Sequence, residues 1–522
     1  MGISLGWVCG AGVWAAVALG ALPVSAQDPQ PARSRLGINL SGPADWNTEY
    51  PFVDAFRLAR TWISQKKGTK WGGGPPLELD AQGWVKRLEP DCFAETPLCT
   101  HGHAPKGEYV CLYEGEGKID FAQIKGVVDS KPGRIVFETE GKGFFLKILE
   151  TNPEKPVRDI RVILPGFEGT YREQPFHPLF LRRWSGFNTF RFMDWMETNG
   201  SKVSRWEDRP APDRYTWTER GIPLEVMIDL CNRLKVNPWF CMPHLADDGY
   251  VRKFAEMAKA KLNPALKVHV EYSNEVWNGM FEQTRHARKK AVELGIGPKD
   301  RPWEGGCMYY ARRSIEIFKA WEEVFGGRER LVRVLAWQAA SGAYWTDGML
   351  LSRDDSAKQA DALAIAPYVT MCVPAKSDKA GALTADVVAG WTLEQLMDHV
   401  EQKALPGSLK WIADQKKVAD KHGLKLLAYE GGQHLVGVGG GENNDAMTKL
   451  FQAANRHPRM GAVYAKYLDG WRDAGGDLFC IFSSVGGWSK WGSWGLAEYY
   501  DETEEQQPKL KAVMEWNRRN PR

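Results

Sequence analysis

Two glutamates stand at the ends of strand-forming runs, where a carboxylate is costly to bury unless something uses it. The stretch HVEYSNEVWNG, residues 269–279, leads a strand-like run directly into Asn274 and Glu275. Much later, the stretch LLAYEGGQH leads another run into Glu430. Two carboxylates held together suit glycoside hydrolysis: one protonates the departing glycosidic oxygen, and the other attacks the anomeric carbon or activates water.

These carboxylates meet only if the strands that carry them belong to one sheet. Strand-like runs alternate with amphipathic helical segments along the chain, which indicates a parallel sheet. Eight such units predict a closed (β/α)8 TIM barrel of the α/β class, in which the carboxyl ends of the strands line one mouth. Glu275 then ends the fourth strand and Glu430 the seventh. The predicted strands are residues 35–41, 188–195, 237–244, 267–275, 331–338, 360–368, 424–432 and 475–484.

The segment between the first two strands is too long for one helix and has a different texture. After a predicted barrel helix at residues 52–63, residues 80–166 contain short β-rich runs broken by Gly, Pro and Asn. We therefore expect a β-sandwich-like domain inserted between strands one and two, and we expect it to contribute little to bond cleavage. Residues 27–79 are then the first part of the barrel, and residues 167–522 are the remainder.

The motif SNE after the fourth strand and the lone glutamate closing the seventh resemble those of clan A retaining glycoside hydrolases, which are (β/α)8 enzymes. The stretch NTFRF resembles the second-strand segment of that clan, which carries an arginine, here Arg191. The resemblance implies that Glu430 is the nucleophile, that Glu275 is the acid/base and that Arg191 orients the nucleophile. It also implies that Asn274 holds the sugar 2-hydroxyl, a contact that strengthens at the transition state.

The resemblance extends to two aromatic residues. Tyr368, which ends the sixth strand, resembles the aromatic or His side chain that leans over the nucleophile in the clan. Trp488, after the eighth strand, resembles the sugar-stacking tryptophan. One departure is that Val276 follows the glutamate of the fourth strand where many clan members have proline, so no subfamily is identified. The inserted domain has no counterpart in the resemblance.

Further polar and aromatic residues are predicted at the same mouth. The third strand ends in PHLADDGY, which places His244, Asp247 and Asp248 there as binders of sugar hydroxyls, with a metal site as the alternative. The chain has 23 tryptophans, which offer flat stacking surfaces, although a large core accounts for many of them. Trp277 is predicted to bind substrate. The tryptophans at or after predicted strand ends are Trp195, Trp277, Trp337, Trp345, Trp488, Trp491 and Trp494.

The N-terminus has the pattern of a secretory signal peptide. An apolar, Gly- and Ala-rich run ends in VSA, with small residues at the cleavage positions, and then turns polar. We expect residues 1–26 to be removed, so that the mature protein starts near Gln27. This predicts a secreted or periplasmic protein with no membrane span after cleavage.

Composition and cysteine spacing limit the partners. The formal net charge of +3 gives no reason to expect nucleic acid, and the oligomeric state is left open. Cys92, Cys99, His101 and His103 lie close together, but their spacing matches no zinc pattern, so a disulfide or free thiols are favoured. No cofactor or metal is predicted, and the expected partner is a carbohydrate substrate.

Other enzyme classes lack their motifs in this chain. A serine hydrolase would carry G-x-S-x-G, which occurs only at residues 2–6, inside the predicted signal peptide, and the H-E-x-x-H of a zinc protease does not occur. The hypothesis is therefore a secreted retaining glycoside hydrolase acting on a poly- or oligosaccharide. The alternative is a non-catalytic carbohydrate-binding or surface protein on the same barrel scaffold.

Overall fold

The structure is a computed structural model that describes residues 34–379 and 381–521. The predicted signal peptide lies outside these residues. Within the described part of the chain, no helix is long and apolar enough to cross a membrane.

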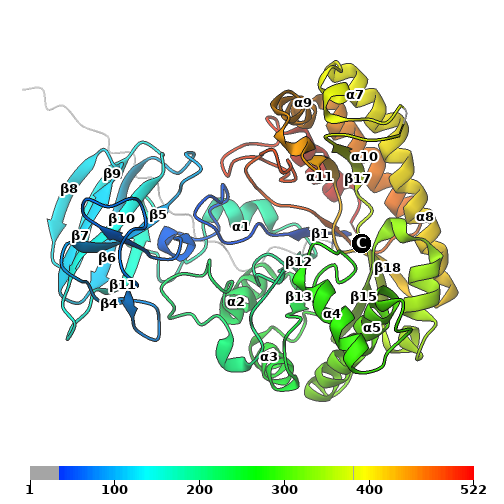
Figure 1. Cartoon of the computed structure of the whole chain (residues 1–522), viewed down its shortest axis with the longest axis horizontal. Coiled ribbons are helices and arrows are strands. Elements are labelled where there is room, and N and C mark those ends of the chain that lie inside the picture. The colour runs from blue at the N-terminus through cyan, green and yellow to red at the C-terminus, as the bar shows by residue number, and fades with distance from the viewer. Residues whose placement is uncertain (1–33, 380, 522) are drawn as a thin grey trace, which may run out of the picture. The chain divides into compact units, whose positions relative to one another are not determined.

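Eight parallel strands form a closed barrel, which confirms the predicted fold class (Figure 1). Each of the eight predicted runs contains one of these strands, and each strand pairs with its neighbours in chain order until the last pairs with the first. The barrel strands are β1 (Leu36–Asn39), β12 (Thr189–Arg191), β13 (Asn237–Met242), β14 (Val268–Tyr272), β15 (Leu331–Ala336), β16 (Ala362–Ile365), β18 (Lys425–Ala428) and β20 (Phe479–Ile481).

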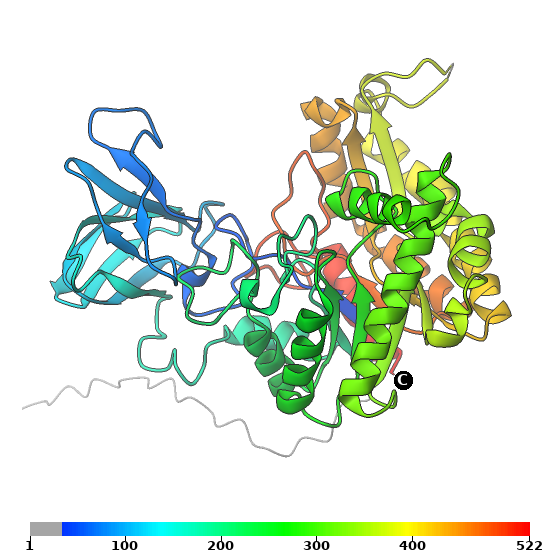
Figure 2. The same cartoon turned by 60° about the horizontal axis from the view of Figure 1, so that its bottom comes forward.

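Helices connect the barrel strands and cover their outer faces, as Figures 1 and 2 show in turquoise through green and orange to red. They are α1 (Pro178–Trp184), α2 (Leu224–Leu234), α3 (Asp248–Lys261), α4 (Glu282–Glu293), α5 (Pro302–Phe325), α6 (Ala385–Ala389), α7 (Leu393–His399), α8 (Leu405–Lys421), α9 (Asp445–Arg456), α10 (Pro458–Asp473) and α11 (Pro508–Arg519). The 3-10 segments are Ala55–Leu58, Trp206–Asp208, Ala339–Ser341, Ser356–Gln359 and Gly441–Asn443, and the π-helical ones are Tyr344–Leu351 and Val400–Ala404.

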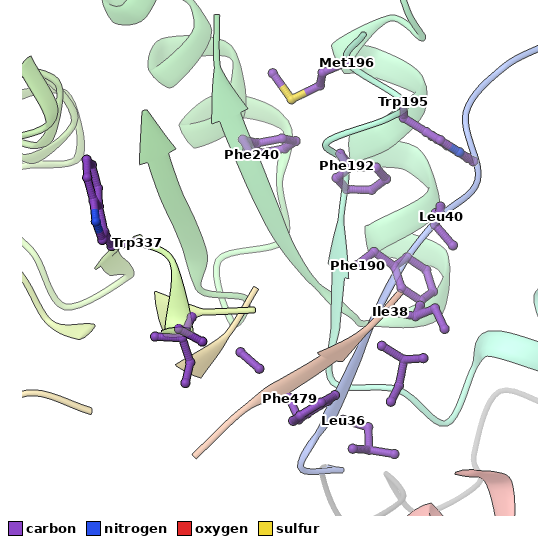
Figure 3. Close-up of a cluster of buried hydrophobic side chains, with 14 of the residues drawn as sticks. Leu36, Ile38, Leu40, Phe190, Phe192, Trp195, Met196, Phe240, Trp337 and Phe479 are labelled. Carbon is purple, nitrogen blue, oxygen red and sulfur yellow. The ribbon is translucent and has the colours of Figure 1, made fainter. Parts of the chain in front are cut away.

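The main hydrophobic core lies between the strands and the helices. Phe192 is an example: its ring centroid lies 5.5 Å from that of Trp195 and 5.7 Å from that of Phe240 (Figure 3). A second, smaller cluster fills the inside of the barrel and includes Trp239 and Tyr429. Because the interior is filled, only the strand ends are left to form a site.

Two four-stranded antiparallel sheets stand between β1 and β12, as predicted for the insertion. One sheet has the order β2 (Ile63–Lys66), β5 (Cys92–Leu98), β10 (Phe144–Thr151) and β7 (Gly117–Ala122). The other has the order β11 (Arg158–Ile163), β6 (Gly107–Glu114), β9 (Arg134–Thr139) and β8 (Gly126–Lys131). A hairpin of β3 (Glu78–Leu79) and β4 (Val85–Arg87) precedes β5. Side chains of both sheets share one hydrophobic cluster, which makes them a sandwich.

The β structure starts earlier than the predicted residue 80, because β2 already pairs with β5. The helix predicted at residues 52–63 is also wrong: only the short 3-10 turn Ala55–Leu58 forms. The segment is bound to the sandwich instead. The side-chain oxygen Oδ1 of Asp54 accepts hydrogen bonds from the backbone N–H groups of both Phe56 and Val162. Tertiary pairing therefore overrides the local helical pattern.

The cysteines of the described residues are free, so neither the disulfide nor the zinc alternative for the Cys92–Cys99 region is realised in the structure. Cys92, Cys99 and Cys111 are buried in the sandwich. They act there as small apolar residues.

A two-stranded parallel ribbon extends two barrel strands beyond the mouth. It consists of β17 (Val369–Pro374), which follows β16, and β19 (Gln433–Val438), which follows β18. The Val369 N–H donates to the Gly432 carbonyl at 2.9 Å, so the two chain segments are joined where they leave the barrel. The ribbon thereby holds Tyr368 and Glu430 next to each other.

Candidate active site

The centre of the mouth is a fully buried arginine, Arg191, at the end of β12. Its guanidinium donates to Glu430 Oε1 at 2.8 Å, to Asn274 Oδ1 at 2.9 Å and to Asn39 Oδ1 at 3.1 Å. Its remaining donors reach Glu271 Oε2 at 2.9 and 3.1 Å. This rigid fork ties together the ends of four different strands, which a lysine cannot do.

Glu430 lies two residues beyond β18 and is held from both sides. Arg191 binds one carboxylate oxygen, and the Tyr368 hydroxyl donates to the other at 2.9 Å. The glycine after it is required by packing, because a Cβ at Gly431 would lie 2.2 Å from Cζ of Phe479. The EGG motif therefore brings the backbone close to the barrel core, and the Glu430 carboxylate projects from that backbone.

Glu275 lies three residues beyond β14 and has a different set of partners. The Tyr429 hydroxyl donates to Oε1 at 3.1 Å, and the Asn278 amide donates to Oε2 at 2.9 Å. Glu275 has a φ of 43° and Ser273 a φ of 60°, both in the left-handed region that is unfavourable for residues with a side chain. Such strain persists only where the surroundings fix the backbone, and it concentrates at functional sites.

Asn274 is fixed on both of its polar atoms. Its Oδ1 accepts from Arg191, while its Nδ2 donates to Asn199 Oδ1 at 3.1 Å. The Asn199 oxygen also accepts from Gln283 Nε2 at 2.7 Å. One N–H of Asn274 is therefore used internally, and the second has no hydrogen-bond acceptor among the described residues.

The two carboxyl groups differ in proton affinity. Burial, and next the negative charge of Glu430, raises the pKa of Glu275 to about 8. Burial also raises the pKa of Glu430, but Arg191 and the Tyr368 hydroxyl oppose that shift. With one proton to share, Glu275 therefore holds it and Glu430 is the anion. Two carboxyl groups whose surroundings separate their pKa values in this way suit one acid and one base or nucleophile.

Most of the predicted site residues are brought together in the structure. Arg191 contacts Asn274 and Glu430 directly, and Tyr368 contacts Glu430. Trp277 is half-buried, and its indole lies near the Tyr429 hydroxyl.

Three other predicted residues contact neither glutamate. His244, two residues beyond β13, is buried; its ring packs edge-on against His286, and burial lowers its pKa to about 4. Asp247 caps α3 by accepting from the Tyr250 N–H, and Asp248, in the first turn, forms an exposed ion pair with Arg313. These aspartates serve the helix, which the sequence DDGYVRKF also permits.

The prediction that Trp488 stacks on a sugar ring is wrong. The side chain is only 7% exposed, and the cationic ends of Arg456 and Lys509 lie over its ring at 4.4 and 4.7 Å. It therefore has no free face for a sugar. Trp494 lies closer to the site instead: its indole N–H donates to His434 Nδ1 at 3.0 Å, and the His434 ring packs on Tyr368.

Two residues of this site were missed from the sequence. Glu271, inside β14, is 1% exposed and accepts from both Arg191 and the Trp239 indole. Asn39, at the end of β1, accepts from Arg191 and donates to the Tyr429 carbonyl. A charged residue within a buried strand was the available signal for Glu271, because such a group needs a partner. Asn39 gave no comparable signal.

Comparisons with known proteins add only distant likenesses. No protein-family model matches the sequence, and no curated protein matches it. A 4-O-α-L-rhamnosyl-β-D-glucuronidase from Fusarium oxysporum 12S is similar with a TM-score of 0.40 and 10% identity over 67% of this chain and 66% of that chain. The Clostridium thermocellum endo-1,4-β-D-xylanase 10B has a TM-score of 0.36 and 11% identity over 92% of this chain and 100% of that chain. An endo-β-1,4-mannanase from Thermotoga petrophila has a TM-score of 0.34 and 11% identity over 65% and 71%. Likenesses this distant carry no argument about the site.

Proposed function

We propose that the chain is a retaining glycoside hydrolase that acts on a poly- or oligosaccharide by double displacement. The proposal rests on one observation: two glutamates at one barrel mouth have different hydrogen-bond partners and different proton affinities. Glu430 is bound by a cation and a phenol, whereas Glu275 has two neutral donors and a pKa raised to about 8, chiefly by burial. This is the division between a nucleophile and a protonated general acid.

In the first step, a carboxylate oxygen of Glu430 attacks the anomeric carbon. The bond from that carbon to the glycosidic oxygen breaks, and Glu275 gives its proton to the departing oxygen. Arg191 and Tyr368 keep the attacking carboxylate ionised and oriented. The free N–H of Asn274 donates to the 2-hydroxyl oxygen of the sugar, a bond that strengthens as charge develops on the ring.

In the second step, the Glu275 carboxylate takes a proton from water, whose oxygen attacks the same carbon. The ester bond to Glu430 breaks, which releases a sugar with its original anomeric configuration. The net change is the addition of one water molecule across one glycosidic bond. Glu275 is protonated again and Glu430 is again an anion.

The test is a hydrolysis screen over plant, algal and fungal polysaccharides with product analysis. For a substrate that is cleaved, NMR of the first product should show the retained anomer. An inverted first product would refute the double displacement. Binding without cleavage of any polysaccharide, unchanged by Glu430→Gln, would favour the non-catalytic carbohydrate-binding protein.

We also propose that the protein is exported, on the strength of the apolar run that ends in VSA. N-terminal sequencing of protein recovered outside the cytoplasm should begin near Gln27. Exported protein that retained residues 1–26 would contradict this.

A further inference from the structure

A cavity of about 510 Å³ lies beside the proposed catalytic residues. It is bounded by the loop after β1, the loop after β12 and the first residues of the inserted segment. We call it the Trp46 cavity, and its size is that of a small-molecule site. Its lining side chains that enter the argument are Asp45, Trp46, Arg60, Asp194, Glu197 and Asn199.

Two links connect the Trp46 cavity to the catalytic groups. Asn199, in its lining, accepts the hydrogen bond from Asn274 at 3.1 Å. Asp194 lies close enough to Glu430 that the Glu430 charge adds to burial in raising the Asp194 pKa to about 7. Both links lead to groups that would touch the sugar attacked by Glu430. The cavity therefore lies beside the place that this sugar would occupy.

Trp46 provides a flat surface in this cavity. Its side chain is 59% exposed, although the Arg60 guanidinium lies over the ring at 5.7 Å. Arg60 is fixed by two hydrogen bonds to Asp45, at 2.8 and 2.9 Å, and the Thr100 hydroxyl binds Asp45 at 2.8 Å. The ring is thus anchored from the sandwich while most of its surface stays free. Flat apolar rings of this kind pack well against sugar rings.

The charges around the Trp46 cavity are unbalanced. Arg60 is neutralised by Asp45, and no other lysine or arginine lines the cavity. In the described part of the chain, the Asp194 and Glu197 side chains have neither a hydrogen bond nor an ion pair. Burial raises the pKa of both carboxyl groups to about 7, so above that pH both are anionic acceptors without donors, and hydroxyl groups are donors. A uronic acid or sulfated sugar would then add a further anion beside them, which like-charge repulsion disfavours.

We propose that the Trp46 cavity is a subsite for an uncharged sugar residue of the glycan, with the sugar ring on Trp46 and its hydroxyls donating to Asp194 and Glu197. This inference rests on the proposed function and narrows its substrate to neutral glycans. It also gives the inserted sandwich a role in binding rather than in bond cleavage, through Asp45, Arg60 and Thr100.

The test uses binding, so that it does not depend on turnover. In the full-length Glu275→Gln variant, calorimetry would compare neutral hexasaccharides (xylo-, cello- and mannohexaose) with hexagalacturonate and chitosan hexamer. We expect a neutral hexamer to bind most tightly. Adding Trp46→Ala should weaken its binding roughly tenfold, the effect of losing about one aromatic contact. Trp71→Ala, at a tryptophan 58% exposed on the sandwich, is the matched control and should change nothing.

Adding Asp194→Asn should narrow the preference for the neutral hexamer over hexagalacturonate by several-fold or more. Tightest binding of hexagalacturonate or of the chitosan hexamer, no binding of any neutral hexamer, or no effect of Trp46→Ala would each overturn the proposal. Retaining hydrolysis that is indifferent to Trp46→Ala would leave the proposed function standing without this subsite. Trp46-dependent binding by a protein that cleaves no glycan would support the subsite and contradict the proposed function.

Discussion

The ends of β18 and β14 each present a glutamate to the same mouth, but they surround it differently. At the end of β18, Arg191 supplies a positive charge to Glu430 and Tyr368 supplies a phenol. At the end of β14, Glu275 receives only the Tyr429 hydroxyl and the Asn278 amide. A buried carboxylate beside a cation tends to stay ionised, and one beside neutral donors tends to keep its proton. The roles proposed for the two glutamates therefore rest on their neighbours rather than on their residue type.

The largest expected effect comes from removing the carboxylate at the end of β18. Glu430→Ala should lower kcat by at least about 10⁴-fold on every substrate, because no glycosyl-enzyme ester can form. Adding azide or formate should restore turnover, since the small anion enters the space left by the side chain. The measurement is kcat on an aryl glycoside with and without azide. Residual activity that azide does not raise would argue against Glu430 as the nucleophile.

The next effect comes from the cation that distinguishes the two ends. Arg191→Lys keeps the charge but loses the fork that reaches Asn39, Glu271, Asn274 and Glu430 at once. We expect kcat to fall about 10²-fold or more and the melting temperature to drop, because a buried carboxylate loses its partner. Arg312→Lys, at an exposed arginine of α5 that pairs with Glu316, is a control for the loss of a guanidinium as such. Unchanged activity in Arg191→Lys would show that the Arg191 guanidinium does not create the difference between Glu430 and Glu275.

Removing the carboxyl at the end of β14 should have an effect that depends on the leaving group. Glu275→Ala should lower kcat on an unactivated glycoside by about 10²–10⁴-fold, the usual contribution of a general acid. It should lower the first step much less on an aryl glycoside with an acidic phenol, because that leaving group needs little protonation. Pre-steady-state release of the phenol measures this step. Equal losses on both substrates would contradict the acid role.

The smallest expected effects are shifts of two different limbs of the pH profile. The Tyr429 hydroxyl lowers the pKa of Glu275, so Tyr429→Phe should raise it and move the basic limb of kcat/KM to higher pH. The Tyr368 hydroxyl lowers the pKa of Glu430, so Tyr368→Phe should raise it and move the acidic limb to higher pH. Plateau rates should change by no more than about tenfold in Tyr429→Phe. If both variants moved the same limb, Glu275 and Glu430 would not have the different roles proposed for them.

The barrel was predictable because its strands are buried on both faces and so form continuous apolar runs. Glu275 and Glu430 were found because they interrupt or end such runs. The short turn at Ala55–Leu58 was not, because its N-cap residue, Asp54, accepts through its carboxylate from the Val162 N–H, on a strand that lies far along the chain. No local pattern in FVDAFRLARTWI records that pairing.

Side-chain contacts between different strands were the hardest to foresee. Trp488 and Trp494 both follow β20, and only the placement of Arg456 and Lys509 shows which ring is enclosed. Likewise, Asp194 lies near the end of the predicted strand 188–195 and Glu197 follows it, but their lack of hydrogen-bond donors depends on the loop after β1. Sequence spacing gives the strand end and not the direction in which each side chain meets its neighbours.

The close approach of Gly431 to Phe479 also limits how this site can vary. Any side chain at position 431 would enter the ring of Phe479, which itself belongs to the barrel core. Glycine at position 431 is therefore tied to Phe479, an aromatic residue distant in the sequence, whatever residue occupies position 430. In a library that randomises positions 430 and 431 together, survivors should keep glycine even where the glutamate is lost, because folding selects the glycine before catalysis selects the glutamate.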